Sequence, residues 1–426
     1  MKTKLSGKFY LALILFSLIG QVAWVVENMY LNVFIYKTFN ATAADISAMV
    51  AASAVAATLT TVFIGALSDK IGKRKIFMCG GYIAWGISIL CFILVKEEII
   101  KSVFPNVVSA ASVGITLVII LDCVMTFFGS SANDAAFNAW LTDSTDASNR
   151  GAAEGLNAMM PLVAILAVFG GFMAFNLDDA SSWTYIFAII GIVVTAVGLI
   201  GLFIIKEPKI EKSKESYIKT VIYGFRPSTV KSLPALYIYL AAFVIFNISI
   251  QIFMPYLIIY YEVSLGMKDY VFVMAPAIVL ASAVTALWGK VYDKKGFSLC
   301  SKFSLSWLAV GYIILYFFKS TAPVFIGSLL MMCGYLSGMA VFGAKLRELT
   351  PNGKAGMLQG VRIFAQVLLP GVIGPYIAKL MLADAETLIN SDGTASFIPN
   401  ESIFAAALAA VALLALLLFV FRKKRV

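Results

Sequence analysis

Three carboxylates lie inside long apolar stretches of the sequence: Glu27, Asp122 and Asp134. An ionised group at the centre of a bilayer costs roughly 2.5–3.5 kcal/mol on insertion scales, so each of these residues is a candidate for function. Burial of a carboxyl away from water favours its protonated form. We therefore expect reversible binding of a proton or a cation, with Glu27 as the first candidate, Asp134 the second and Asp122 the third.

The composition argues against other kinds of chemistry. The 426 residues include no His, which removes imidazole metal ligands and His-dependent catalytic triads. The five Cys are scattered and show no CxxC spacing. No GxxxxGK[ST] loop is present, so ATP-driven work by this chain is disfavoured. We expect no enzyme activity, no metal site and no cofactor beyond a coupling ion, H⁺ or Na⁺.

A polar stripe accompanies Glu27 in the first apolar stretch. Gln21, Trp24, Asn28 and Asn32 are spaced i, i+3, i+7 and i+11, which puts them on one face of a helix. An indole ring beside amides suits a sugar, whose C–H face stacks on the ring and whose hydroxyls need donors and acceptors. The alternative is that the amides bond to neighbouring helices and that Trp24 serves packing.

Other polar residues in apolar segments are candidates for substrate contact, and each could instead serve helix packing. Asn247 and Gln251 are separated by one helical turn, and Pro255 follows them with an aromatic cluster. The full set of further candidates is Asn138, Asn247, Gln251, Tyr256, Arg362 and Gln366.

The elements that carry these residues are membrane spans. Hydrophobic residues make up 61% of the chain and charged residues only 13%, compared with about 45–50% and about 25% in soluble domains. We predict an all-α polytopic membrane protein with twelve transmembrane helices. The predicted spans are near 9–36, 43–67, 76–95, 107–141, 154–176, 183–205, 234–261, 270–291, 300–318, 322–344, 356–382 and 401–421.

The spans form two pseudo-symmetric halves that carry a repeated motif. We predict an N-terminal six-helix bundle at 1–205, a connecting loop at 206–233 and a C-terminal six-helix bundle at 234–426. The pattern GxxxDxxG follows span two as Gly65, Asp69 and Gly72, and follows span eight as Gly289, Asp293 and Gly296. Duplicated six-span halves are typical of transporters that work by alternating access, with a site near the bilayer midplane.

The basic residues fix the expected orientation. If both termini are cytoplasmic, the cytoplasmic segments hold nearly all of the 33 Lys and Arg residues, which satisfies the positive-inside rule. The net charge of +10 is then a consequence of topology, so we expect no nucleic acid partner. The exceptions are Lys37, Lys96, Lys101, Lys268, Lys319 and Lys379.

The segment GALSDKIGKRK, with Gly65, Asp69, Gly72 and Arg74, resembles the cytoplasmic signature of the major facilitator superfamily (MFS). GKVYDKKG at Gly289 to Gly296 resembles its weaker second copy. The resemblance implies a conformational latch, in which Asp69 contacts the start of span eleven and Asp293 contacts the start of span five near Arg150. The alternative is that these are solvated loop charges that only support orientation.

Two further segments resemble one group in that superfamily, the glycoside, pentoside and hexuronide symporters. Gln21, Trp24 and Glu27 are similar to span one of its proton-coupled sucrose carriers. The segment from Asp134 to Asp146 resembles the end of span four in melibiose-type sodium symporters, which implies cation binding by Asp134. Span two has Thr58, Thr60 and Thr61 but no carboxylate before Asp69, so a proton is favoured and sodium stays open.

We therefore expect a monomeric multi-pass protein of the cell (inner) membrane that imports a small saccharide or glycoside together with a proton. The first alternative is an exporter of drugs or lipophilic metabolites. The second is a membrane sensor that has the carrier fold but has lost transport.

Overall fold

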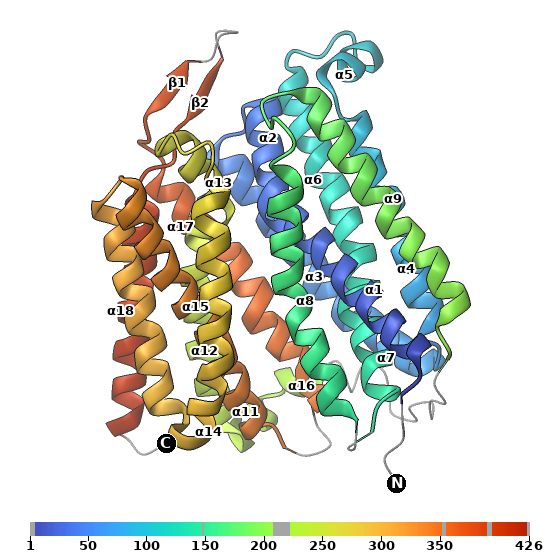
Figure 1. The fold of residues 1–426 in the computed structure, drawn as a ribbon, viewed down its shortest axis with the longest axis vertical. Helices are drawn as coiled ribbons and strands as arrows, with labels where there is room; N and C mark the ends of the chain where they lie inside the picture. The colour runs from blue at the N-terminus through green and yellow to red at the C-terminus, as the bar shows by residue number, and fades with distance from the viewer. Residues whose placement is uncertain (1–4, 147–148, 208–221, 352–354, 390–393, 424–426) are drawn as a thin grey trace. The chain divides into compact units, whose positions relative to one another are not determined.

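The computed structural model describes residues 5–146, 149–207, 222–351, 355–389 and 394–423. It is built almost entirely of helices, with one two-stranded sheet (Figure 1). Eleven helices of the described chain are long and apolar enough to cross a membrane. One of them, α14 (Val271–Phe317), has 47 residues and changes direction at Gly296, so its two arms serve as spans eight and nine. The predicted all-α polytopic fold is confirmed, with the twelve expected spans.

The first six spans contain these elements. They are α1 (Gly7–Val25), a π-helical segment (Val26–Tyr30), α2 (Leu31–Phe39), α3 (Ala43–Ile71), α4 (Lys75–Cys91), a 3₁₀ turn (Phe92–Leu94), α5 (Glu97–Val103), α6 (Ala110–Gly129), a π-helical segment (Ser130–Phe137), α7 (Asn138–Asp143), α8 (Arg150–Phe172) and α9 (Ala180–Ile204).

The remaining elements follow the connecting loop. They are a 3₁₀ turn (Tyr223–Phe225), α11 (Pro227–Ser232), α12 (Pro234–Phe253), a 3₁₀ turn (Met254–Tyr256), α13 (Leu257–Ile259), a π-helical segment (Tyr260–Ser264), α14, α15 (Thr321–Leu349), α16 (Ala355–Ile363), a π-helical segment (Phe364–Leu368), α17 (Leu369–Met381), β1 (Thr387–Ile389), β2 (Ala395–Phe397) and α18 (Ser402–Lys423).

The chain forms two compact units, one of residues 1–41 and 52–221 and the other of residues 42–51 and 222–426. In the first unit, α4 packs along α9, and α1 packs against α8 and α9 (Figure 1). Glycine permits the close approach of α4 to α9, because a Cβ on Gly86 would lie 2.5 Å from the Gly191 carbonyl oxygen.

In the second unit, α14 packs against α15, and α12 packs against α17 and α18 (Figure 1). Here too a glycine is needed at a crossing, because a Cβ on Gly334 of α15 would lie 2.5 Å from the backbone nitrogen of Leu308 on α14. Tight packing of this kind is how membrane helices associate when lipid removes the hydrophobic driving force.

Three features of the fold were not expected from the sequence. The segment after span three contains the short helix α5, and β1 and β2 pair as an antiparallel hairpin before α18. In addition, four π-helical segments interrupt the spanning helices of the described chain. Each adds about one residue to a turn, so the faces of the helix before and after it no longer align.

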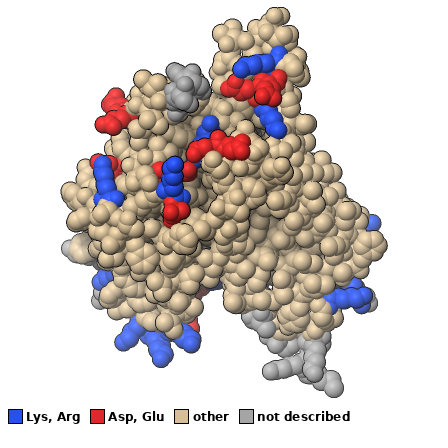
Figure 2. Space-filling view, turned by 45° about the horizontal axis from the view of Figure 1, so that its top comes forward, with Lys and Arg blue, Asp and Glu red and all other residues tan. Residues whose placement is uncertain are grey.

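Charged side chains are sparse on the surface. Figure 2 shows a largely uncharged face, with acidic side chains gathered in the upper part of the view and mainly Lys and Arg along its lower edge. Uncharged flanks with charges near the helix ends are what a protein surrounded by lipid requires.

Candidate functional site

Glu27 lies in the π-helical segment of the first span and is buried, with 6% of its surface exposed. Its Oε1 accepts hydrogen bonds from Thr126 Oγ1 at 2.8 Å and from Ser53 Oγ at 2.9 Å. The two hydroxyl oxygens are themselves 2.8 Å apart. Its Oε2 has no hydrogen-bond partner among the described residues. One carboxyl oxygen is thus fixed by two donors, while the other remains available to hold a proton.

Asp122 lies on α6, one turn before Thr126, and only 2% of it is exposed. Its Oδ1 has no hydrogen-bond partner within the described chain. The charge of Asp122 acts electrostatically on Glu27. The fold therefore brings Glu27 and Asp122 into one polar cluster, together with Ser53 and Thr126.

Asp134 lies about three turns further along the same span, in the π-helical segment Ser130–Phe137. It is half-buried, and its Oδ2 accepts a hydrogen bond from Ser130 Oγ at 3.0 Å. The exposed Asn138 donates its side-chain amide to the Asp134 carbonyl oxygen at 3.0 Å. No hydrogen bond in the described chain connects Asp134 to Glu27, but the charge of Asp134 also acts electrostatically on Glu27, more weakly than that of Asp122.

The polar stripe of the first span does not continue as one α-helical face. The π-helical segment between Trp24 and Asn32 changes the angular spacing, so Asn28 is exposed whereas Asn32 is fully buried. Their amides donate to the helix backbone, Asn28 to the Trp24 carbonyl at 2.8 Å and Asn32 to the Asn28 carbonyl at 2.9 Å. Gln21 is half-buried. The expectation of a single stripe is corrected, because a π-turn breaks the 3.6-residue period.

Trp24 lies against a second indole that the sequence reasoning missed. Its ring centroid is 5.0 Å from that of Trp85 on α4, at an interplanar angle of 49°. The Nε1 atoms of both indoles are buried and have no hydrogen-bond acceptor among the described residues. Close packing explains the pair, because a Cβ on Gly129 would lie within 3.0 Å of both rings.

A buried hydrogen-bond network nearby was also missed. The Tyr82 hydroxyl donates to the Phe16 carbonyl oxygen at 2.5 Å, and the Asn133 amide donates to the Tyr82 hydroxyl at 2.7 Å. The network ties α1, α4 and the π-helical segment of span four together. Asn133 lies in the polar run from Ser130 to Asp134 inside a predicted span, and that position was the signal available in the sequence.

The candidates of the second half lie within the second unit. Asn247 is buried and donates to the Phe243 carbonyl at 2.8 Å, and the backbone of Gln251 packs closely against Gly374. The Tyr256 hydroxyl donates to the Ala43 carbonyl at 3.0 Å, so it serves packing in this structure. Arg362 and Gln366 are half-buried, and Gln366 lies in the π-helical segment Phe364–Leu368.

Three of the four π-helical segments hold predicted site residues: Glu27 and Asn28 in the first, Asp134 in the second and Gln366 in the fourth. π-Helical turns cost hydrogen-bond geometry and are frequent at functional sites. They provide backbone evidence for the candidate residues that is independent of side-chain chemistry.

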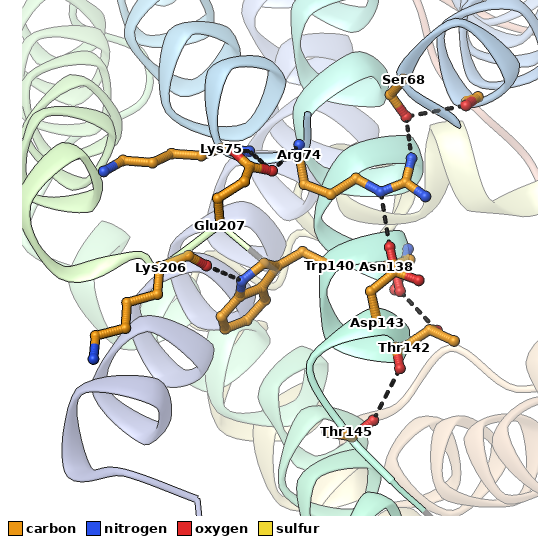
Figure 3. A network of polar contacts seen from close by, with 11 residues as sticks. Ser68, Arg74, Lys75, Asn138, Trp140, Thr142, Asp143, Thr145, Lys206 and Glu207 are labelled. Atoms are coloured by element: carbon orange, nitrogen blue, oxygen red, sulfur yellow. Dashed lines mark hydrogen bonds and ion pairs between the residues drawn. The ribbon is translucent and has the colours of Figure 1, made fainter. Parts of the chain in front are cut away.

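Ser68, Arg74 and Lys75, in and directly after the first copy of the repeated motif, belong to a polar network at one end of the first unit (Figure 3). The Arg74 side chain is only 5% exposed, and its Nε donates to Asp143 Oδ2 at 2.9 Å. Its Nη1 donates to Ser68 Oγ at 2.5 Å. The backbone N–H groups of Arg74 and Lys75 donate to the Glu207 carboxylate. Arg74 thus links the ends of spans two, four and six.

The other proposed latch residues are placed as follows. The backbones of Gly65 and Gly289 lie within helices, while Gly72 and Gly296 adopt positive φ angles of 70° and 72°. Asp293 is exposed. The side chains of Asp69 and Arg150 lie outside the described residues, so the latch contacts stay predictions.

The fold and the buried polar cluster define a multi-pass helical membrane protein whose carboxylates lie within its spans. The family model of the Major Facilitator Superfamily matches residues 10–375. The chain therefore belongs to the Major Facilitator Superfamily, whose members are membrane transporters of small molecules. No curated protein matches the sequence significantly.

Solved transporters share the fold at low sequence identity. A mutant of the nucleoside transporter NupG superimposes with a TM-score of 0.72 at 12% identity, covering 97% of this chain and 98% of that chain. A bacterial homologue of the human lysosomal transporter Spinster, inward-facing and occupied, gives 0.71 at 14% identity, covering 99% and 98%. A D-xylose-proton symporter gives 0.69 at 15% identity, covering 96% and 97%.

Proposed function

We propose that this transporter is a proton-coupled symporter that imports a sugar or glycoside by alternating access in the cell (inner) membrane. Within the superfamily we assign it to the glycoside, pentoside and hexuronide symporters. The observation that carries the proposal is the environment of Glu27, which is buried, held at Oε1 by two hydroxyls and unpartnered at Oε2.

This environment can alternate between two states. The hydroxyls of Ser53 and Thr126 stabilise the carboxylate when it is ionised, because hydrogen bonds to a charged group are worth about 1.5–3 kcal/mol each. A proton on Oε2 neutralises the group and removes the cost of a bare charge in a low-dielectric site. Reorientation of the carrier is then favoured in the protonated, substrate-loaded form and in the empty form whose carboxylate Ser53 and Thr126 stabilise, but not with only one of the two bound, which couples the two fluxes.

The substrate class follows from the side chains around Glu27. Trp24 is only partly buried and offers aromatic surface, while Gln21 and Asn28 offer amides. A molecule with many hydroxyls and C–H faces matches this set better than a lipophilic one. The nucleoside transporter and the D-xylose-proton symporter with the same fold carry molecules rich in hydroxyls, which supports the proposal.

The test is uptake of labelled sugars into proteoliposomes under an imposed inward proton gradient. Glu27→Gln keeps the size and polarity of the side chain but cannot release a proton. We expect it to abolish uphill accumulation while sugar exchange across the membrane persists within a few-fold of wild type. The matched control is Glu98→Gln, because Glu98 is an exposed carboxylate on α5 outside the spans.

Each result of this assay bears on the proposal. Accumulation driven by the proton gradient in Glu27→Gln would overturn the role of Glu27, and Asp134→Asn and Asp122→Asn would then be compared. Accumulation that requires a sodium gradient would replace the proton by sodium. Drug efflux without sugar import would favour the exporter, and neither activity would favour the sensor.

A further inference from the structure

The second unit contains an open groove of about 710 Å³ between α12, α14 and α18. Its walls are mainly apolar, and they include Ile238, Leu305, Leu408 and Val411. This volume lies within the range of pockets that hold drug-sized ligands, about 300–1,000 Å³. The groove lies wholly in one unit, and none of the residues proposed for coupling or substrate binding lines it.

One face of α14 brings a line of polar side chains into this apolar groove. Ser298, Lys302 and Ser306 are spaced i, i+4 and i+8, so they follow one another along the helix, and all three line the groove. Lys302 is exposed, and it makes no hydrogen bond or ion pair with the described residues. No Asp or Glu lines the groove. The groove therefore offers an uncompensated cation and two hydroxyls to a ligand.

Lys302 lies six residues beyond the turn at Gly296, about 9 Å along the helix axis. At that depth an unpaired ammonium on a lipid-facing surface is costly, and it must reach towards polar headgroups or bind an anion. The groove extends to this end of the helices, where Ala235, Ser298 and Phe419 line it.

Basic residues flank all three helices at this end. In the sequence, Lys231 precedes α12, Lys294 and Lys295 precede Gly296, and Arg422 follows Phe419. Clusters of Lys and Arg beside membrane helices attract anionic lipid headgroups. The charge of this region is complementary to a phosphate, and its apolar wall is complementary to an acyl chain.

We propose that this groove is a binding site for an anionic glycerophospholipid from the leaflet on the Lys- and Arg-rich side. An acyl chain lies against the apolar residues of α12 and α18, and the phosphate contacts Lys302 with the hydroxyls of Ser298 and Ser306. The site is independent of the proposed transport chemistry and would stabilise the packing of spans seven, nine and twelve.

The test is native mass spectrometry of the purified full-length protein, titrated separately with phosphatidylglycerol and phosphatidylcholine of identical acyl chains. We expect one phosphatidylglycerol to bind more tightly than any phosphatidylcholine. Lys302→Gln should weaken this binding about fivefold, and Lys302→Arg should restore it, because one cation near the surface contributes about that factor. The matched control is Lys268→Gln, which removes an exposed cation that belongs neither to the groove nor to the basic residues beside it.

A second variant separates the acyl chain from the headgroup. Ala412→Trp fills the groove and should abolish the tight lipid, with thermal unfolding in lipid-free detergent used to verify that the variant folds. The proposal is overturned if Lys302→Gln and Lys268→Gln weaken lipid binding equally, or if glycerol phosphate without acyl chains competes as well as the lipid. It is also overturned if the groove mediates a lipid-free dimer that Ala412→Trp dissociates.

Discussion

At position 27 a single carboxylate combines burial, two hydroxyl donors on one oxygen and no partner on the other. The sequence alone indicated that a carboxylate at position 27 is costly in a membrane. It did not indicate the hydrogen-bond donors of Glu27, because Ser53 and Thr126 lie on α3 and α6, far from Glu27 in the sequence. Those donors determine how stable the ionised state is and therefore how readily the site releases a proton. The same holds for Asp122, whose relevance depends on its proximity to Glu27.

The role of the Thr126 hydroxyl can be tested by Thr126→Val, which keeps the shape of the side chain and removes one donor from Glu27. The lost hydrogen bond to a carboxylate is worth about 1.5–3 kcal/mol, so the ionised state becomes harder to reach. If proton release limits turnover, the initial rate of sugar uptake falls about tenfold or more. Thr126→Ser keeps the donor and should retain most of the activity. Equal rates in Thr126→Val and wild type would contradict this role.

At the scale of elements, the repeated GxxxDxxG motif has a backbone explanation. Its final glycines, Gly72 and Gly296, both adopt φ angles near 70°, in a region that other residues rarely occupy. The motif therefore ends in a turn of the same hand after spans two and eight. In α14 the non-helical backbone at Gly296 separates the arm that forms span eight from the arm that forms span nine.

Gly296→Ala and Gly289→Ala form a matched pair that tests this explanation. A Cβ at either position would meet no atom within 4 Å, but only Gly296 has a positive φ. We expect Gly296→Ala to destabilise the protein by about 1–3 kcal/mol through backbone strain. Gly289→Ala should be neutral or slightly stabilising, because alanine favours the helix. Thermal unfolding in detergent measures both, and equal unfolding temperatures would refute the turn argument.

At the scale of the whole molecule, a transporter must keep each unit coherent while it changes conformation. In the first unit the network around Arg74 performs this task, since it joins the ends of spans two, four and six (Figure 3). The sequence predicted a role for Arg74 in a latch. The contacts that the structure describes for it bind elements of its own unit, so we infer that it holds this end of the unit together.

A double-mutant cycle of Arg74→Gln and Asp143→Asn measures how much the contact between these two side chains contributes to the free energy of unfolding. Asp143 is partly exposed, at 28% of its side chain, so we expect a coupling of about 1–3 kcal/mol, below the range for fully buried pairs. Strict additivity of the two changes would argue against the network. The control cycle is Lys101→Gln with Glu97→Gln, an exposed pair on α5 for which no measurable coupling is expected.

Much of the architecture could be predicted because membrane spans impose local constraints. The length of the apolar stretches indicated the twelve spans, and the rarity of acidic residues inside them singled out Glu27, Asp122 and Asp134. The sequence could not predict the partners Ser53, Thr126, Tyr82 and Asn133, since hydroxyls and amides are common in spans and their contacts depend on packing. The π-helical segments could not be predicted either, because a turn widened by one residue leaves no local signal in the sequence.

The sequence by itself determined that the chain crosses the membrane many times, that its halves repeat a motif and that its cations concentrate on one side. These properties depend on the cost of transferring residues into lipid and on the conformational freedom of glycine, which act locally. The tertiary structure decided which carboxylates share an environment, where Arg74 binds and where a groove opens beside Lys302. Those contacts join residues that are far apart in the chain, so only the packing of the helices could determine them.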